Sequence, residues 1–366
     1  MKKDRSLDVV VVGLGGVGRA LVEQIQTVAS QLRFKGDVQL CIAGLADRGG
    51  LLYCEGGLDA CVVGQALDAK ACGESIGRVD KALPPIQRFR ELATDRTLFV
   101  DATAAPGMAA TWCETLESGA AGVVLANKLP LCEPWDASQR LFADHQVRYE
   151  ATVGAGLPVL STLRSLLATG DSVLKMRGAL SGTLGYLVHQ VSKGCAFSAA
   201  LSEAIALGYV EPDPRADLSG HDVARKALIL SRTVGWHVEM SDVNLCGLVP
   251  DQDMALRGAS VDDSRVDRPL RALFTAATDD GVALRYLAEI SAESIRVGLT
   301  PIDLEDPFAA LDGPENRITV LTKRYSPHPL AIAGPGAGAK VTAAGVLSDL
   351  LDLAERSHPK GDKPCP

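Results

Sequence analysis

The stretch LDVVVVGLGGVG, residues 7–18, is a run of β-branched residues that passes directly into a glycine-rich loop. Such a run is typical of a strand buried on both faces, and residues 19–32 continue in a helical pattern. The glycines permit a tight turn and a close approach of backbone to a pyrophosphate, toward which the helix N-terminus directs its N–H groups. The stretch therefore predicts a dinucleotide site. The residues expected to form it are Gly13, Gly15, Gly16, Val17 and Gly18.

The second predicted strand, residues 38–46, ends in Asp47-Arg48, and these two residues give conflicting indications. An acid at this position accepts a hydrogen bond from the ribose 2′-hydroxyl of NAD, whereas an arginine accommodates the 2′-phosphate of NADP. We lean slightly to NADP through Arg48, with NAD also usable. An ordinary polar exit from the strand is a third interpretation.

Two further buried strands are predicted at residues 97–101 and 121–126, with a helix over 106–118 between them. This alternation indicates a Rossmann-type, doubly wound parallel sheet of the α/β class. Ligands of such sheets bind beyond the carboxyl ends of the strands, which places Thr103 and Lys128 around the cofactor. Lys128 is a candidate for the reaction centre, although a solvated lysine at a strand end would look the same.

A helix over 135–146 and a strand over 147–152 precede the loop Val153-Gly154-Ala155-Gly156-Leu157-Pro158. Its carbonyl groups must find partners, because buried backbone polar groups are almost always paired. A bound monovalent cation would satisfy them. A sharp hinge between domains explains the same residues equally well.

From residue 153 onward the pattern changes to strands that follow one another with turns, which predicts a second, α+β domain. Its strands are expected at residues 173–180, 282–290, 294–299, 318–325 and 329–333. An open sheet of this kind is often covered by a symmetric copy, so we expect a homodimer.

The glycine-rich loop 334–338, with Gly336 and Gly338, leads into a helix over 340–356, and we expect this segment to return to the first domain and close its cofactor cleft. The predicted domains are therefore a dinucleotide-binding domain (1–152, completed by 334–356), a substrate-binding and dimerisation domain (153–333) and a disordered tail (357–366).

Residues 208–230, GYVEPDPRADLSGHDVARKALIL, combine a stiff acidic loop with a helix. The prolines rigidify the loop, so that the carboxylate of Glu211 projects from a fixed backbone. The helix is expected to begin near residue 218 with Ser219 as its cap, and it places Asp222 and Lys226 one turn apart. By themselves these two could be an ordinary solvated ion pair.

Composition limits the class of protein. The 366 residues carry a net charge of −8 and lack a basic cluster, which argues against nucleic-acid and membrane partners. Nine cysteines without paired spacing indicate reduced thiols and no structural zinc. No apolar run is long enough to span a bilayer or act as a signal peptide, so we expect a cytoplasmic protein acting on a small-molecule substrate.

Several stretches together resemble the homoserine dehydrogenases, over nearly the whole chain. They are GLGGVG, NK at 127–128, EATVGAGLPVL, GALSGTLGY, GYVEPDPRADLSGHDVARKALIL and GPGAGAKVTAAGVLSDLL. The sequences of these stretches are most similar to the dehydrogenase part of bifunctional aspartokinase–homoserine dehydrogenases, without a kinase before it or a regulatory module after it. Feedback inhibition by threonine through such a module is accordingly not expected.

The resemblance implies NADP- or NAD-dependent interconversion of L-homoserine and L-aspartate 4-semialdehyde by hydride transfer, in threonine and methionine biosynthesis. It implies Lys226 as proton donor, Glu211 and Asp222 as substrate-binding carboxylates with Asp217 nearby, Lys128 as an active-site lysine and Gly208 beside the nicotinamide. It further implies a structural Na⁺ or K⁺ ion held by the carbonyls of Glu150, Val153, Ala155 and Leu157. The serine pair common beside Thr103 in the family is Ala104-Ala105 here, which leaves the cofactor preference open.

Overall fold

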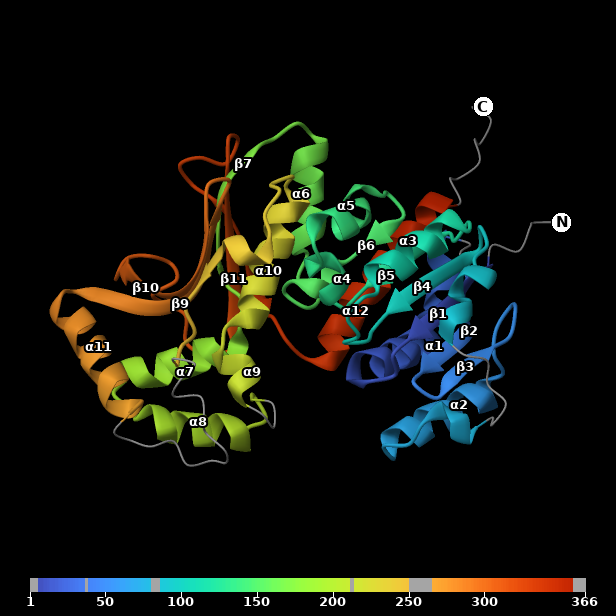
Figure 1. The fold of residues 1–366 in the computed structure, drawn as a ribbon, viewed down its shortest axis with the longest axis horizontal. Helices are drawn as coiled ribbons and strands as arrows, with labels where there is room; N and C mark the ends of the chain where they lie inside the picture. The colour runs from blue at the N-terminus through green and yellow to red at the C-terminus, as the bar shows by residue number, and fades with distance from the viewer. Residues whose placement is uncertain (1–5, 37–38, 80–85, 211–213, 250–264, 358–366) are drawn as a thin grey trace. The chain divides into compact units, whose positions relative to one another are not determined.

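The computed structural model describes residues 6–36, 39–79, 86–210, 214–249 and 265–357. Its internal contacts divide the chain into two compact units, each built around its own sheet (Figure 1). The first unit comprises Met1–Gly156 with Gly338–Pro366, and the second comprises Leu157–Ala337. Glu211 and the predicted tail beyond Ser357 lie outside the described residues.

The first unit contains a six-stranded sheet in the order β3-β2-β1-β4-β5-β6. All neighbouring strands pair in parallel except β2 and β3, which form an antiparallel hairpin. The strands are β1 (Ser6–Val12), β2 (Gln39–Asp47), β3 (Gly50–Tyr53), β4 (Thr97–Asp101), β5 (Gly122–Leu125) and β6 (Val147–Arg148). The predicted doubly wound sheet is confirmed. The antiparallel edge strand β3 was not foreseen, because four residues are too few to establish a pattern.

Helices and short 3₁₀ turns connect these strands. They are α1 (Gly16–Gly36), α2 (Ala60–Ala71), η1 (Ile76–Arg78), η2 (Ile86–Glu91), α3 (Ala109–Glu117), α4 (Leu129–Cys132), α5 (Trp135–Ala143) and η3 (Glu150–Thr152). The C-terminal helix α12 (Ala339–Ser357) packs against α1 and contacts β5, and its apolar side chains join the core of this unit. The strand expected over 147–152 is shorter than predicted, because the chain turns into η3 at Glu150.

The second unit contains a mixed sheet in the order β12-β11-β7-β9-β10-β8, antiparallel except for the pair β10 and β8. Its strands are β7 (Val173–Ala179), β8 (Val243–Leu245), β9 (Val282–Ser291), β10 (Ile295–Asp303), β11 (Glu315–Thr322) and β12 (Leu330–Pro335). Its helices are α6 (Val159–Ala168), α7 (Gly182–Ser192), α8 (Phe197–Ala206), α9 (Pro214–Leu218), α10 (His221–Thr233), η4 (Met240–Asp242) and α11 (Asp267–Asp279). The expected α+β architecture is confirmed.

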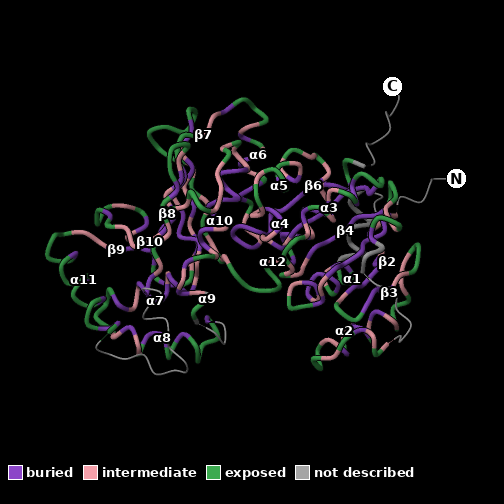
Figure 2. The backbone as a smooth tube through the Cα atoms, in the orientation of Figure 1, coloured by how far each residue is buried: buried purple, intermediate pink, exposed green. Residues whose placement is uncertain are grey.

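Side chains alternate between the two faces of this second sheet, as the strand period requires. Met176, Ile290 and Ile318 lie on one face and are buried. Figure 2 shows buried segments in purple along central strands and helices of each unit. The opposite face carries ion pairs, among them Arg177 with Glu289. The same face also carries Ala179 and Leu287, which are buried in an apolar cluster with Phe308, so it combines charged and apolar groups.

Helix α10 begins later than its sequence pattern predicts. Its cap position is Gly220, in a left-handed conformation with φ +74°, and the Ser219 hydroxyl accepts a long bond from the His221 N–H at 3.4 Å. A Cβ at Gly220 would lie 2.0 Å from the Tyr286 hydroxyl, so packing against β9 selects glycine here. No helix in the described part of the chain is long and apolar enough to cross a membrane.

Candidate active site

The glycine loop after β1 shows which of its glycines the protein itself requires. Gly13 has φ +95°, and a Cβ there would come within 2.7 Å of the Ala102 backbone. A Cβ at Gly18 would lie 2.0 Å from the Gly13 carbonyl oxygen. A Cβ at Gly15, by contrast, would meet nothing within 4 Å. Because no protein atom demands glycine at position 15, its place in the motif fits a requirement imposed by a ligand's close approach.

Arg48 and Thr103 follow neighbouring parallel strands of the first sheet. Gly13 donates its N–H to the Ala46 carbonyl at 2.9 Å, which places the end of β2 directly beside the glycine loop. Arg48 lies in the turn after β2 and is exposed, while Thr103 follows β4 and is half-buried. Both therefore occupy the edge of the sheet at which dinucleotides bind in this class of fold.

Asp101, the last residue of β4, is fully buried and organises this edge, although no sequence pattern singled it out. One carboxylate oxygen accepts from the N–H and the hydroxyl of Thr103, at 3.0 and 2.7 Å. The other accepts from Trp112 Nε1 at 2.9 Å and Asn127 Nδ2 at 3.2 Å. Asp101 thus fixes the loops that follow β4 and β5 relative to each other.

Lys128 follows Asn127 and lies at the cap position of the short helix α4. Its side chain is half-buried. The Asn127 side chain is buried, donates to the Ala105 carbonyl at 2.9 Å and accepts from the Leu129 N–H at 3.0 Å. These bonds hold the backbone on either side of Lys128, so its amine projects from a rigid segment.

In the second unit, Lys226 on α10 is buried, with 8% of its surface exposed. Its Nζ donates to the Leu180 carbonyl at 2.6 Å and pairs with Asp222 Oδ2 at 2.8 Å. The Asp222 side chain keeps 40% of its surface exposed. This is therefore not the solvated surface pair that the spacing alone allowed, since the amine is held inside the unit and only the acid reaches the surface.

Gly208, expected beside the nicotinamide, lies at the end of α8, close to the start of α7. The Thr183 hydroxyl donates to the Tyr209 carbonyl at 2.6 Å, and the Tyr186 and Tyr209 rings meet edge to face. Gly208 has φ +72° and closes α8 with its N–H on the Ile205 carbonyl, a helix-ending role that requires no cofactor. Asp217 lies half-buried on α9.

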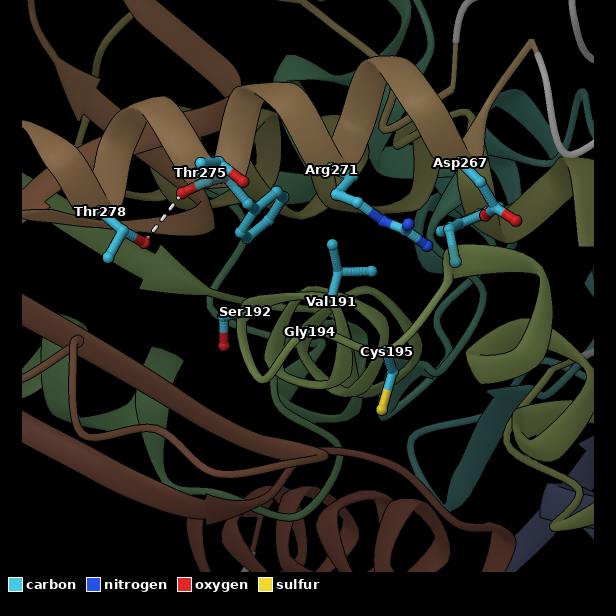
Figure 3. A pocket seen from close by; sticks show the side chains of 10 residues that line it. Val191, Ser192, Gly194, Cys195, Asp267, Arg271, Thr275 and Thr278 are labelled. Carbon is cyan, nitrogen blue, oxygen red and sulfur yellow. Dashed lines mark hydrogen bonds between the residues drawn. The ribbon is translucent and has the colours of Figure 1, made fainter.

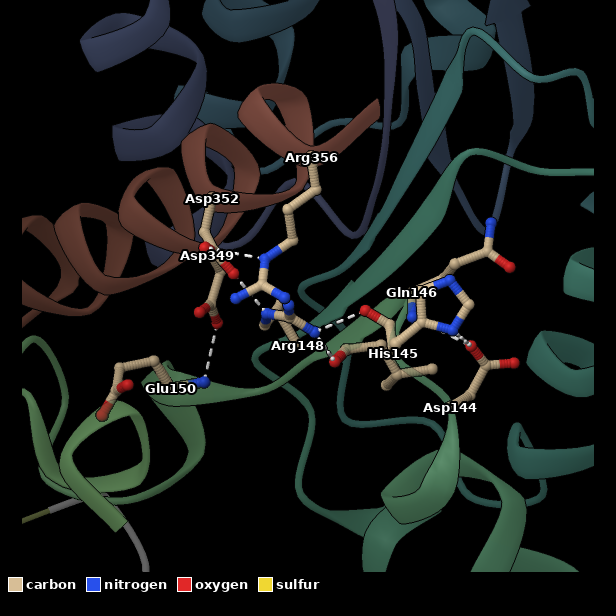
Figure 4. Close-up of polar contacts among 9 residues, drawn as sticks. Asp144, His145, Gln146, Arg148, Glu150, Asp349, Asp352 and Arg356 are labelled. Atoms are coloured by element: carbon tan, nitrogen blue, oxygen red, sulfur yellow. Dashed lines mark hydrogen bonds and ion pairs between the residues drawn. The ribbon is translucent and has the colours of Figure 1, made fainter. Parts of the chain in front are cut away.

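The loop proposed to hold a cation packs tightly on α12. Ala155 has φ +57°, the only positive φ of a non-glycine residue in the described chain, and a Cβ at Gly345 would lie 2.7 Å from its carbonyl oxygen. Asp349 accepts from the buried Glu150 N–H at 2.7 Å, and Arg148 pairs with Asp352 at 2.6 Å (Figure 4). Helix α12 therefore fixes the backbone of this loop.

Two carbonyls expected to bind the cation already accept hydrogen bonds. The Glu150 carbonyl accepts from the Val153 N–H at 3.3 Å, and the Leu157 carbonyl in the second unit accepts from Val159 at 2.8 Å. A carbonyl oxygen has two lone pairs, so these bonds leave room for a ligand. Among the described residues, no cluster of three or more His, Cys, Asp or Glu side chains could hold a metal ion.

The loop after β12 contains Gly336, against which Asn316 packs. A Cβ at Gly336 would lie 1.9 Å from Asn316 Nδ2. Asn316 is 1% exposed, and within the described chain neither polar atom of its amide has a hydrogen-bond partner. Gly338 has φ +113°, a conformation that other residues rarely adopt. The sequence drew attention to these two glycines and gave no indication of Asn316.

A separate pocket of the second unit lies between α7 and α11. Figure 3 shows Arg271 and Asp267 of α11 across from Val191 and Cys195. No predicted site residue lines it.

Comparisons with known proteins identify the family of this chain. The family model described as homoserine dehydrogenase matches residues 158–351. A bifunctional aspartokinase/homoserine dehydrogenase from Zea mays is 36% identical over 95% of this chain, which spans only 38% of that relative's length. The homoserine dehydrogenase of Saccharomyces cerevisiae is 33% identical over 96% of this chain and 98% of its own.

Solved structures share the fold. A Candida auris protein of unknown function is 31% identical with a TM-score of 0.82, covering 96% of this chain and 99% of its own. A hyperthermophilic archaeal homoserine dehydrogenase in complex with NADPH has a TM-score of 0.73 at 22% identity, covering 96% of this chain and 98% of its own. Since the family model covers more than half of the chain and the yeast relative matches it almost end to end, the chain belongs to the homoserine dehydrogenase family.

Proposed function

We propose that this chain catalyses the NAD(P)-dependent interconversion of L-homoserine and L-aspartate 4-semialdehyde. The observation that carries the proposal is the buried amine of Lys226, anchored on the Leu180 carbonyl and paired with Asp222. General acid catalysis needs a proton donor held at a fixed position, and this amine meets that need. Family membership supplies the reaction class.

The first unit is suited to bind the dinucleotide. Gly13 and Gly18 shape the turn, Gly15 leaves space for the pyrophosphate, and Gly16 and Val17 begin the helix whose N–H groups face phosphates in this kind of site. Thr103 and Lys128 then belong to the nicotinamide end. When bound, the cofactor accepts or supplies the hydride.

In the second unit, we propose that carboxylates bind the ammonium group of the substrate. Asp222 is partly exposed beside Lys226, and Asp217 and Glu211 precede it in the chain. A carboxylate that accepts from an ammonium group selects an amino acid over a plain hydroxy acid. Lys226 donates a proton to the substrate oxygen in the reducing direction and accepts it in the oxidising direction. Lys128 adds positive potential for the developing oxyanion.

Three further proposals concern a bound cation, the oligomeric state and the cellular location. A Na⁺ or K⁺ ion held by the carbonyls of residues 150–157 is supported by the positive φ of Ala155 and the tight packing of α12. A homodimer is supported by the open edge strand β12, which pairs only with β11 in the part of the chain that the structure describes. A cytoplasmic location without nucleic-acid or membrane partners is supported by the acidic composition.

The proposal is tested by following NADPH and NADH formation with L-homoserine at alkaline pH. Lys226→Met should lower the rate at least about 100-fold with little loss of cofactor affinity, because general acid–base catalysis contributes 10²–10⁴-fold. Lys193→Met, the same change at an exposed lysine that caps α7, is the control. Turnover by Lys226→Met near the wild-type rate would refute the role of Lys226. If the protein oxidised a related hydroxy amino acid but not homoserine, the assignment of homoserine as the substrate would be wrong.

The role of Glu211 needs its own variant. Glu211→Gln keeps the shape of the side chain and removes its charge, so it should chiefly raise the KM for homoserine. A fall in kcat alone would instead show that Glu211 is not the ammonium anchor.

A further inference from the structure

A cavity of the second unit lies where the last turns of α7 and α11 approach strand β9. Its volume is about 340 Å³, which falls within the range of small-molecule sites. It adjoins the pocket of Figure 3, with which it shares Ser192 and Thr278. None of the described residues assigned to cofactor or substrate lines it, so the proposed function gives it no task. Its apolar lining comes from Phe274, Ala277, Ala283, Leu304, Ala309 and Ala310.

The charged group in the wall of this cavity is the guanidinium of Arg285, a residue of β9 that is 9% exposed. Its Nε donates to the Phe308 carbonyl at 3.2 Å, its Nη1 donates to the Leu284 carbonyl at 2.8 Å, and its Nη2 donates to the Ala309 carbonyl. A guanidinium has five N–H donors, so these three bonds fix its position and leave one N–H on each Nη for a ligand.

The positive charge of Arg285 has no carboxylate partner among the described residues. Burial lowers the pKa of Arg285, and no acid opposes that effect. Its charge also reaches His189 on α7: burial lowers the pKa of His189 most, and Lys193 and Arg285 lower it further against the opposing effect of Asp312. A buried charge without a counter-ion is costly, and a carboxylate bound to both Nη atoms would compensate it.

The rim of the cavity carries the opposite charge. Four exposed acids adjoin lining residues, in the chain or across the β9–β10 pair: Asp279, Asp280, Asp303 and Glu305. In the described part of the chain none of these four carboxylates has an ion-pair partner. The last turns of α7 and α11 add the partial negative charge of helix C-termini. The rim therefore attracts an ammonium group and repels a second negative charge.

We propose that this cavity binds a small aliphatic α-amino acid. Its carboxylate lies on Arg285, its ammonium group faces the acidic rim, and its hydrocarbon chain packs on Phe274 and Leu304. A simple carboxylate lacks the group that the rim attracts, an amine leaves Arg285 without a counter-ion, and phosphate brings more negative charge than the rim accepts. Binding at this cavity does not depend on the proposed function, and it is measured without turnover.

Isothermal titration calorimetry of the full chain with L-leucine tests the proposal. L-leucine should bind with a Kd of about 1 mM or tighter, as expected for a ligand of its size. Two analogues of the same chain each lack one charge: 3-methylbutanoate has no ammonium group and 3-methylbutylamine has no carboxylate. Each should bind at least about 10-fold more weakly, because one charged contact is lost. Inorganic phosphate should not compete with L-leucine.

Variants locate the binding. Ala310→Trp places a large side chain at an exposed position of the cavity wall and should weaken L-leucine at least about 10-fold. Ala272→Trp makes the same change at an exposed position of α11 that does not line the cavity, and should leave the affinity unchanged. Asp222→Asn alters the proposed substrate site and should also leave it unchanged.

Arg285→Met removes the guanidinium and should weaken L-leucine at least about 10-fold while leaving 3-methylbutylamine unaffected. This variant also loses three bonds to carbonyl groups, so its fold is checked by circular dichroism and by its unfolding midpoint. If it does not fold, Ala310→Trp and the two analogues decide the question.

The inference is wrong if L-leucine gives no heat of binding up to about 10 mM, or if its affinity is the same in Ala310→Trp as in the wild type. Equal binding of 3-methylbutanoate would remove the role of the rim, and equal binding of 3-methylbutylamine would remove the role of Arg285; either result overturns the proposed ligand class. Loss of binding in Asp222→Asn would place L-leucine in the substrate site instead. A chain that binds L-leucine in the cavity but does not oxidise homoserine keeps this inference and loses the proposed function.

Discussion

Asp101→Asn tests whether one buried carboxylate holds the edge of the first sheet together. Asparagine has nearly the same shape, but its amide presents one acceptor oxygen where Asp101 presents two. The better orientation keeps the oxygen toward Trp112 and Asn127, which leaves the Thr103 N–H without an acceptor. A buried donor left unpaired costs about 1–3 kcal/mol, and the two remaining bonds lose the contribution of the negative charge. We expect the free energy of unfolding to fall by about 2–4 kcal/mol.

Chemical denaturation monitored by tryptophan fluorescence measures this change, because Trp112 stacks on Phe89 with ring centroids 5.5 Å apart. Asp95→Asn makes the same substitution at an exposed site of the first unit and should shift the free energy by no more than about 0.5 kcal/mol. The affinity for NADPH should also fall in Asp101→Asn, since Thr103 and Asn127 lose their common anchor. A denaturation midpoint equal to that of Asp95→Asn would contradict the assigned role.

Three other expectations follow from single contacts. Lys226→Arg should retain the positive charge but lose activity at least about 10-fold in the homoserine assay, because a bulkier guanidinium does not fit the buried position of the amine and does not release its proton. Gly220→Ala should destabilise the second unit by about 2 kcal/mol or more in thermal or urea unfolding. The new Cβ would clash with Tyr286, and the alanine backbone would have to adopt a positive φ. Burial alone would raise the pKa of Asp352, but Arg148 and Arg356 outweigh it and lower the pKa. The stability that this carboxylate contributes is therefore present above its unfolded pKa and is lost as the pH falls below about 4. Asp352→Asn should reduce the pH dependence of the free energy of unfolding across that acidic range.

Elements buried on both faces were predictable from sequence because their signal is local. The valines of β1 and the apolar residues of β4 form uninterrupted runs, and both strands lie at the centre of their sheet. The start of α10 was mispredicted for the opposite reason. Ser219 is the better cap by residue type, but packing of Gly220 against Tyr286 moves the helix start to His221.

The candidate site shows the same difference between residues with a local sequence signal and residues whose partners are distant in the chain. The glycine loop is encoded within six consecutive residues, and the close approach of Gly18 to the Gly13 carbonyl lies within that stretch, although Gly13 is also restricted by the distant Ala102 backbone. Asp101 and Asn316 carry no such signal, because the contacts that tie them to other loops come from residues 11 or more positions away: Trp112 and Asn127 around Asp101, and Gly336 against Asn316. Asp47 likewise looks like a ribose acceptor until Lys70 and Ser75 are placed beside it.

Asp222 illustrates how burial assigns a task that spacing leaves open. An i,i+4 pair on a surface helix would leave both partners solvated and contribute little. Here Lys226 is buried on the Leu180 carbonyl, 46 residues away, while Asp222 keeps 40% of its side chain exposed. An exposed acid bound to a buried amine presents part of its surface to a ligand without releasing its partner. We therefore expect Asp222 both to hold the substrate's ammonium group and to keep Lys226 in place, so Asp222→Asn should raise the KM and lower kcat together. A change in KM alone would assign it to the substrate, and a change in kcat alone would assign it to the lysine.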